Sequence, residues 1–409
     1  MREILYTRAN IFLTGAGGVG KTFLVNSAVN ELRNKDLDVA VTAITGIAAK
    51  HLFGKTLHSW SCIGVSTDID YILNTKQWRY VGRKRLAATD VLIIDEISML
   101  GDETFHLVDD LLKIAKNNLQ PFGGCRLIVV GDFFQLPPIR DRYCFEGNSW
   151  KEFNFTILNL YENYRANDED WINVLKHLRV GNVNQDVKDM FSRRITKPET
   201  DDITRLVCLN READVINKKK LAEINNPTRI FKYEVKDLSR IIKPPDIVNF
   251  FKNSVVKESI PLKIGAYVMI VVNDKGGSYV NGTCGEIIDM DSKWIHIRTD
   301  EGYLIKVLAQ HPFLIRKKVK GKFKDANICC TPVIHGWAVN IHKAQGVTLK
   351  RARIDLSNGF ADGQAYVAFS RIKSEDGVYL DSEPSLSCLQ ANRDVLQYTL
   401  DNIKEFRGE

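Results

Sequence analysis

The sequence lacks an apolar run long enough to cross a bilayer, a metal-ligand cysteine pattern, an internal repeat and a low-complexity tract. Its longest apolar run, near residues 266–272, is about seven residues long, whereas a transmembrane helix needs roughly 18–20. The eight cysteines form no CxxC pair, which favours free thiols in a reducing compartment. We therefore expect a soluble intracellular protein, cytoplasmic if its source is bacterial or viral.

The composition is that of a globular protein. The chain has 409 residues, too many for one ordinary core, so we expect two or three domains. Hydrophobic residues make up 44% and charged residues 26%, which excludes a wholly disordered, collagen-like or coiled-coil protein. The net charge of +7 permits a polyanionic partner without proving one.

Short apolar runs alternate with amphipathic stretches, which predicts βαβ units and parallel sheets covered on both faces. In the first half, strands are expected at 11–13, 39–41, 91–94, 127–130 and 156–158, and helices at 21–33, 102–117 and 170–179. A second set follows, with strands at 206–209, 352–356 and 378–380 and helices at 212–223 and 364–371. The fold class is therefore α/β.

Three segments depart from this alternation. Residues 260–330 contain short β-rich pieces separated by Gly, Asn and Asp turns, which suggests a small antiparallel barrel inserted into the second α/β domain. Residues 237–253, with two adjacent prolines, resemble a linker. Residues 62–88 are interpreted as an irregular insertion in the first domain.

The strongest chemical signal is residues 15–22, GAGGVGKT, which fit GxxxxGK[ST] between an expected strand and an expected helix. Glycines let backbone N–H groups surround phosphate oxygens, and the helix N-terminus adds partial positive charge. Lys21 is expected on the β- and γ-phosphates and the Thr22 hydroxyl on Mg²⁺. The alternative is a glycine-rich turn with an exposed lysine.

Two further strand ends carry side chains suited to hydrolysis. Asp95 and Glu96 follow the apolar run 91–94, and carboxyl ends of parallel strands meet at one edge of a sheet. Asp95 would hold Mg²⁺ through water, and Glu96 would take a proton from the attacking water. Gln135, in GDFFQLPP (131–138), would bond the terminal phosphate and the lytic water. A solvated strand end and an ordinary proline-terminated loop are the alternatives.

Several ordered blocks resemble the PIF-type (petite integration frequency) DNA helicases of superfamily one, which are related to RecD-like helicases. The blocks are TGAGGVGKT (14–22), TAITGIAAK…TLHSW (42–60), IIDEISML (93–100), GDFFQLPP (131–138), LYENYRANDEDWINVLKHLRVG (160–181), CLNREADVIN (208–217), VNGTCGEI (280–287), TPVIHGWAVNIHKAQGVTL (331–349) and GQAYVAFSR (363–371). The resemblance covers roughly residues 9–380.

The resemblance implies two RecA-like doubly wound parallel-sheet domains, the second with a small β-barrel insertion. We expect the first domain at 1–165, with a wedge-like insertion at about 62–88, and the second at 166–409, interrupted by the barrel at about 255–330. The implied activity is that of an ATP-dependent DNA helicase with ATP and Mg²⁺ as cofactors, moving 5′-to-3′ on single-stranded DNA and unwinding forked or structured duplexes. It also implies roles in DNA repair, recombination and telomere maintenance, and we expect a monomeric motor.

Residue by residue, the resemblance implies a nucleotide site, a pair of arginine fingers and a strand-binding groove. The nucleotide would be held by Gly15, Ala16, Gly17, Gly18, Val19, Gly20, Lys21, Thr22, Gln345 and Gly346. The catalytic residues would be Lys21, Asp95, Glu96, Gln135, Arg165 and Arg371, with both arginines on the second-domain side and Mg²⁺ held by Thr22 and Asp95. The residues that would contact the nucleic acid are Thr45, Gly46, Thr56, His58, His342, Lys343 and Thr348.

Other features leave alternatives open. Four alternating lysines form either a basic ridge for nucleic acid or a solvated hairpin: Lys318, Lys320, Lys322 and Lys324. The aromatic rings of Trp60, Phe133 and Phe134 either stack on bases or lie in the core. The insertion at 62–88, with Trp78 and Tyr80, is the candidate wedge.

Two points keep the function itself open. Family members usually carry a Gln some twenty residues before the phosphate loop, but only 14 residues precede Gly15 here and none is Gln. Either the start is shortened or base recognition is relaxed. The competing functions are an ATP-dependent clamp that does not unwind and, less favoured, a nuclease or recombinase with a motor attached.

Overall fold

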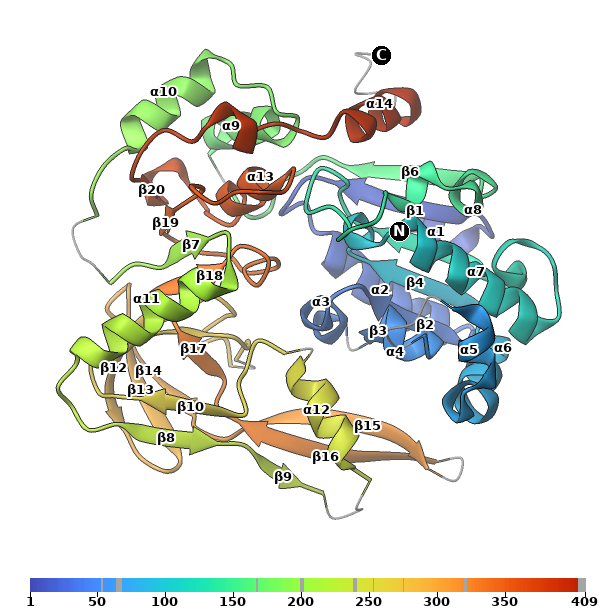
Figure 1. Cartoon of the computed structure of the whole chain (residues 1–409), viewed down its shortest axis with the longest axis horizontal. Helices are drawn as coiled ribbons and strands as arrows, with labels where there is room; N and C mark the ends of the chain where they lie inside the picture. Colours follow the sequence, from blue (N-terminus) through green and yellow to red (C-terminus); the bar gives the residue numbers. More distant parts are fainter. Residues whose placement is uncertain are drawn as a thin grey trace. The chain divides into compact units, whose positions relative to one another are not determined.

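The computed structural model describes residues 1–52, 54–63, 68–166, 168–198, 202–237, 241–252, 254–274, 276–319 and 322–403 (Figure 1). By its contacts the chain divides into two compact units. Unit 1 comprises Met1–Met190, Gly359–Ser370 and Pro384–Glu409, and unit 2 comprises Phe191–Asn358 and Arg371–Glu383. Among the described helices, none is long and apolar enough to span a membrane.

Unit 1 is built on a six-stranded sheet in the order β3-β2-β4-β5-β1-β6, with every neighbouring pair parallel. Its strands are β1 (Asn10–Gly15), β2 (Val39–Ala43), β3 (Lys55–Thr56), β4 (Val91–Asp95), β5 (Arg126–Val130) and β6 (Phe155–Leu160). Its helices are α1 (Arg2–Tyr6), α2 (Lys21–Arg33), α3 (Gly46–His51), α4 (Leu57–Ser61), α5 (Ile69–Asn74), α6 (Arg83–Ala88), α7 (Asp102–Lys116), α8 (Asn148–Lys151), α9 (Glu169–Arg179), α13 (Gln364–Phe369) and α14 (Arg393–Asn402). Helix α10 (Gln185–Arg194) runs from unit 1 into unit 2.

Both faces of this sheet are buried, as its nearly continuous apolar strands predict. Successive residues of a strand point to opposite faces, and in β1 the Phe12 side chain joins one apolar cluster while Ile11 and Leu13 join another. Helix α7 contributes to the cluster around Phe12, and α2 contributes to the cluster around Ile11. The two helices therefore cover opposite faces, and the expected α/β architecture of this region is confirmed.

Among the described residues, unit 2 contains a four-stranded parallel sheet in the order β18-β7-β19-β20 and three antiparallel sheets of five, three and two strands. The parallel sheet is formed by β7 (Arg205–Val207), β18 (Ala338–Asn340), β19 (Ala352–Ile354) and β20 (Val378–Leu380), with α11 (Asn210–Glu223) after β7. The antiparallel strands are β8 (Arg229–Lys232), β9 (Glu234–Lys236), β10 (Ser259–Leu262), β11 (Tyr267–Ile270), β12 (Cys284–Met290), β13 (Trp294–Thr299), β14 (Leu304–Leu308), β15 (His311–Val319), β16 (Lys322–Cys330) and β17 (Val333–His335). They pair as β14-β13-β12-β11-β17, β15-β16-β9 and β10-β8.

Two expectations about irregular segments were wrong. The segment 237–253 contains helix α12 (Pro244–Lys252), in which the two prolines occupy the first helical positions rather than a linker. Proline is tolerated there because the first N–H groups of a helix have no intrahelical partner. The segment 62–88 is also largely helical, since α5, a π-helical turn at Trp78–Gly82 and α6 follow one another along it.

The compact units group the chain differently from the expected domains. Helix α13 and the C-terminal helix α14 belong to unit 1, although the alternation pattern assigned α13 to the second α/β set. Tyr398 of α14 accepts a hydrogen bond from Trp150 and stacks on Phe145, with ring centroids 4.5 Å apart. The domain limits 1–165 and 166–409 and the insertion limits 255–330 stay predictions.

Candidate nucleotide site

The phosphate loop of unit 1 connects the end of β1 to the start of α2. Gly15, Gly18 and Gly20 have positive φ angles of 138°, 92° and 83°, which only glycine adopts readily. A Cβ at Gly15 would lie 2.5 Å from the Leu160 carbonyl oxygen of β6, so the loop lies directly against the neighbouring strand. Val19 is buried, whereas Thr22 in the first turn of α2 is exposed.

The Lys21 ammonium folds back over its own loop. Its Nζ donates to the carbonyl oxygens of Gly15 at 2.7 Å and Ala16 at 2.9 Å. Burial lowers the pKa of Lys21, while the negative charges of Asp132 and Glu96 act in the opposite direction. The cation is therefore desolvated in a site with acidic groups nearby, which strengthens its interaction with any anion that enters.

Asp95 and Glu96 lie where the sequence predicted, at the carboxyl end of β4. The Asp95 side chain is 6% exposed, and burial together with the neighbouring charge of Glu96 raises the pKa of Asp95 to about 7. Glu96 has a positive φ of 57°, and its N–H donates to Asp95 Oδ1 at 2.9 Å. Two adjacent acidic groups, one deeply buried, form an oxygen donor set that a divalent cation would neutralise. The residues present therefore fit Mg²⁺.

Strand β5 leads into a loop that carries Gln135. The Gln135 side chain is 6% exposed, and its backbone N–H donates to the Asp132 carbonyl at 2.9 Å. Since β4, β5, β1 and β6 are successive neighbours, the loops that follow them lie along one edge of the sheet. The structure thus brings the residues 15–22, Asp95, Glu96 and Gln135 to one edge, as expected.

The loop after β6 closes over the phosphate loop. The Tyr164 N–H donates to the Gly18 carbonyl at 2.9 Å, and Asn163 Nδ2 donates to the Gly17 carbonyl at 3.2 Å. A Cβ at Gly18 would lie 2.8 Å from Cβ of Arg165, so Arg165 is directly adjacent to the loop. Arg165 therefore belongs to unit 1 with the phosphate loop, not to the second-domain side where the sequence analysis placed it.

Sequence reasoning missed a buried network beside the phosphate loop. Arg179, at the end of α9, forms a bidentate ion pair with Asp132, with NH2 to Oδ1 at 2.8 Å and Nε to Oδ2 at 3.0 Å. Both side chains are almost fully buried. The hydroxyl of Tyr366 in α13 accepts a hydrogen bond from the Gly17 N–H at 2.8 Å. Asp132 lies in the motif 131–138 and Tyr366 in the motif 363–371, but no local sequence pattern indicates that their side chains are in contact.

Helix α13 is fixed in unit 1 near both of its ends. Gly363, with φ of 70°, lies so close to the preceding loop that a Cβ would be 2.3 Å from the Phe134 carbonyl oxygen and 2.6 Å from that of Gln135. At the other end, Arg165 NH1 donates to the Ser370 carbonyl at 2.9 Å. The helix is therefore held between the loops that follow β5 and β6.

The remaining predicted nucleotide residues belong to unit 2. Arg371 is 2% exposed, and its carbonyl accepts a hydrogen bond from the Leu349 N–H. Gln345 is buried, while Gly346 has a φ of 81° and an open surrounding. Their expected roles toward the nucleotide stay predictions.

The predicted nucleic-acid residues are divided between the units. In unit 1, Thr45 and Thr56 cap short helical turns by accepting from the N–H groups of Ala48 and Ser59. Gly46 begins α3, and His58 lies half-buried in α4. In unit 2, Lys343 is exposed, Thr348 is half-buried, and burial lowers the pKa of His342.

The aromatic candidates for base stacking lie in the core. Trp60, Phe133 and Phe134 are each no more than 4% exposed, and Phe133 contacts Phe12 and Trp150 edge to face or tilted. Core packing, the alternative left open for these rings, is therefore confirmed.

The lysine-rich segment forms an antiparallel hairpin in its backbone. Strand β15 ends at Val319 and β16 begins at Lys322, and the register pairs Lys318 with Phe323 and Lys317 with Lys324. Lys320 lies outside the described residues. Lys318 therefore lies on one strand, and Lys322 and Lys324 lie on the next. Their contact with nucleic acid stays a prediction.

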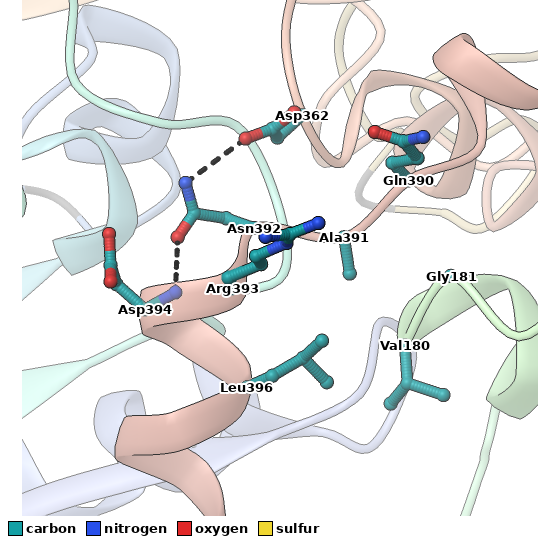
Figure 2. A pocket seen from close by; sticks show the side chains of 9 residues that line it. All are labelled: Val180, Gly181, Asp362, Gln390, Ala391, Asn392, Arg393, Asp394 and Leu396. Atoms are coloured by element: carbon teal, nitrogen blue, oxygen red, sulfur yellow. Dashed lines mark hydrogen bonds between the residues drawn. The ribbon is translucent and has the colours of Figure 1, made fainter.

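Two other groups of residues, a pocket and a cluster of possible metal ligands, contain none of the predicted site residues. A pocket of about 480 Å³ in unit 1 is lined by Val180, Gly181, Asp362, Gln390, Ala391, Asn392, Arg393, Asp394 and Leu396, none of them a predicted site residue (Figure 2). In it Asn392 donates to Asp362 at 3.1 Å, which joins the C-terminal segment to the loop before α13. Within the described residues, His106, Asp109 and Asp110 also come together, but Asp109 already pairs with Lys113 and accepts from the Phe122 N–H.

A parallel sheet with a glycine phosphate loop after β1 and a buried carboxylate at the end of β4 defines a phosphate-loop nucleotide hydrolase. Comparison with known proteins specifies the family. The PIF1-like helicase family matches residues 4–190. The ATP-dependent DNA helicase Pif1 of Bdellovibrio bacteriovorus is 34% identical over 387 residues, which are 92% of this chain and 85% of the relative.

Solved structures agree with this assignment. The structure of Bacteroides Pif1 in complex with ADP-AlF4 has a TM-score of 0.81 at 26% identity, covering 97% of this chain and 94% of that one. Bacteroides Pif1 in complex with ADP-AlF3 and single-stranded DNA has a TM-score of 0.67 at 26% identity, covering 98% and 96%. The chain belongs to the PIF1-like helicase family.

Proposed function

We propose that this chain couples ATP hydrolysis at the phosphate loop of unit 1 to 5′-to-3′ movement along single-stranded DNA and to strand separation. As a family member the chain is an ATP-dependent DNA helicase, with ATP as its cofactor and single-stranded DNA as its partner. The observation that carries the proposal is the meeting of the phosphate loop, Asp95, Glu96 and Gln135 at one edge of the parallel sheet. Two RecA-like domains, with a small barrel in the second, are the proposed architecture of the motor. Roles in DNA repair, recombination and telomere maintenance stay predictions.

The chemistry follows from the side chains at this edge. The amides of Gly18 and Gly20 together with Lys21 bind the phosphates, with Lys21 exchanging its bonds to Gly15 and Ala16 for bonds to phosphate oxygens. Glu96 accepts a proton as water attacks the γ-phosphorus, and the bond to the β–γ bridging oxygen breaks, leaving ADP and phosphate. Asp95 and Thr22 would hold Mg²⁺, which neutralises developing charge on the phosphates when bound.

Arginines supply the remaining positive charge in this proposal. Arg165 stands beside Gly18 of the phosphate loop, and Arg371 is the proposed second finger from unit 2. A guanidinium that reaches the γ-phosphate only in one conformation makes hydrolysis depend on that conformation. Gln345 and Gly346 are the proposed link between nucleotide and strand.

Unwinding needs an element that separates bases, and the helical insertion 62–88 is the proposed wedge. Tyr80 in its π-helical turn is 78% exposed, whereas Trp78 is 3% exposed and belongs to the core. Opening a base pair costs only about 1.4 kcal/mol on average, so one exposed ring is enough to act as the wedge. We expect Tyr80→Ala to slow strand separation while sparing DNA-stimulated ATPase activity, and Tyr6→Ala, also exposed but in α1 outside the insertion, to change neither. Equal slowing by both variants would contradict this role.

The proposed function is tested with duplexes that carry a 5′ or a 3′ single-stranded tail. We expect separation of the 5′-tailed duplex only, complete loss of ATPase and unwinding in Lys21→Ala, and normal activity in the control Lys151→Ala, an exposed lysine of α8. Separation of only the 3′-tailed duplex would contradict the polarity. DNA-stimulated ATPase activity without separation of either duplex would identify the clamp instead.

A further inference from the structure

One hydroxyl group connects helix α13 to the phosphate loop. Tyr366 lies 349 positions after Gly17, yet its hydroxyl accepts the Gly17 N–H at 2.8 Å and lies 3.4 Å from Asp132 Oδ2. The Tyr366 side chain is 2% exposed, so this contact is shielded from water. The phosphate loop therefore has a buried partner that comes from a distant part of the same unit.

Gly17 is held at both of its peptide groups, the one before it through its N–H and the one after it through its carbonyl. Tyr366 accepts from its N–H, and Asn163 Nδ2 donates to its carbonyl at 3.2 Å. The next residue, Gly18, has a φ of 92°, and because neither Gly17 nor Gly18 has a Cβ, the backbone itself restricts rotation here only weakly. Tyr366 thus fixes the direction of the Gly17 N–H, and Asn163 fixes the peptide group that follows it.

The position of the Tyr366 hydroxyl is itself fixed by α13. Close contact of Gly363 with the Phe134 carbonyl sets one end of the helix, and the bond from Arg165 to the Ser370 carbonyl sets the other. Asp132, which accepts from the Tyr366 hydroxyl at 3.4 Å, is in turn paired with Arg179. The hydroxyl cannot shift without disturbing this buried network.

We propose that Tyr366 is a positioning residue for nucleotide binding, which acts by holding the Gly17 peptide of the phosphate loop in its binding conformation. The proposal rests on the proposed function only for the identity of the ligand, a nucleoside diphosphate or triphosphate. Without the hydroxyl, the Gly17 N–H finds a new partner only by rotating toward water. The loop then has to be reordered when phosphate binds, and this cost reduces affinity.

The test compares Tyr366→Phe with Tyr398→Phe, which removes a hydroxyl bonded to Trp150 in the same unit. We expect Tyr366→Phe to raise the Kd for ADP about tenfold, equivalent to about 1.4 kcal/mol, and to raise KM for ATP similarly with kcat within about twofold. Amide hydrogen exchange in a peptide covering residues 13–23 should be faster in this variant, without added nucleotide. Tyr398→Phe should match wild type in all three measurements.

The KM effect separates positioning from a general loss of folding, which would lower kcat with the amount of active protein. Wild-type ADP affinity and wild-type exchange in a folded Tyr366→Phe protein would overturn the proposal. Should Tyr366→Phe not fold, Asn163→Ala provides a second test, because the half-exposed Asn163 side chain bonds the Gly17 carbonyl. Asn163→Ala is expected to weaken ADP binding and to speed exchange in residues 13–23. The absence of both effects would equally overturn the proposal. ADP binding and exchange require no unwinding, so failure of the wild-type protein on tailed duplexes would refute the proposed function alone.

Discussion

The buried ion pair between Arg179 and Asp132 gives a sharp test of how unit 1 is held together. Replacing Arg179 by Met keeps most of the side-chain volume but leaves the Asp132 carboxylate buried without its cation. Breaking a buried pair in this way typically costs about 3–5 kcal/mol. For a domain of this size, about 2–4 °C per kcal/mol predicts a fall of roughly 6–20 °C in the unfolding midpoint.

Tryptophan fluorescence during thermal unfolding measures this effect, because Trp60, Trp78, Trp150 and Trp171 all belong to unit 1. The double variant Asp132→Asn/Arg179→Met should recover part of the loss, since it leaves no buried charge unpaired.

The matched control is Arg142→Ala. Arg142 also places two nitrogens on one carboxylate, that of Asp102, but its side chain is 59% exposed. Exposed ion pairs contribute little to stability, so its midpoint should stay close to wild type. A midpoint for Arg179→Met within about 2 °C of wild type, or a double variant no more stable than the single one, would refute the reasoning.

Four further outcomes are expected. Burial and Glu96 raise the pKa of Asp95 to about 7, so Mg²⁺-dependent ADP binding should weaken up to about tenfold from pH 7 to pH 6. Asp95→Asn should bind ADP weakly, and its affinity should not change over this pH range. The raised pKa of Asp95 contributes most to the free energy of unfolding below pH 4, and this contribution disappears as the pH rises through 7. In urea unfolding, Asp95→Asn should therefore lack this decline of stability with rising pH. A decline equal to that of wild type would contradict the assignment. Neutralising Lys318, Lys320, Lys322 and Lys324 together should weaken binding to all single strands alike and reduce the slope of log K against log salt by up to about 3. An unchanged slope would show that these lysines do not touch the strand. Gly363→Ala should impair ATPase activity and lower the unfolding midpoint, because its Cβ would collide with the Phe134 carbonyl at a φ of 70°. A wild-type midpoint would show that α13 is not fixed at Gly363.

Local signals in the sequence predicted the elements of the phosphate site well. An apolar run followed by glycines placed β1 and α2 correctly, and the apolar run before Asp95 placed β4. These elements could be predicted because period, glycine content and strand-end polarity are properties of neighbouring residues.

Contacts between distant segments could not be predicted in the same way. The assignment of α13 and α14 to unit 1 depends on Tyr366 meeting Gly17 and on Tyr398 meeting Trp150, and neither pair has a local signature. Helix α12 was missed because a double proline predicts a turn or linker unless the apolar residues that follow, such as Phe250, are known to be buried. For the lysine-rich segment the alternating pattern allowed both a continuous ridge and a hairpin, and the register of β15 with β16 shows the hairpin.

The discontinuity of unit 1 along the chain has a consequence for its synthesis. The stacked ring of Tyr398 completes an aromatic cluster whose other members, Phe133, Phe145 and Trp150, leave the ribosome far earlier. At translation rates of about 5–20 residues per second, roughly 10–40 s separate the emergence of Met190 from that of Tyr398. During that interval the nascent first unit exposes an apolar surface, and a chaperone that covers it until the last helix arrives would raise the yield of native protein.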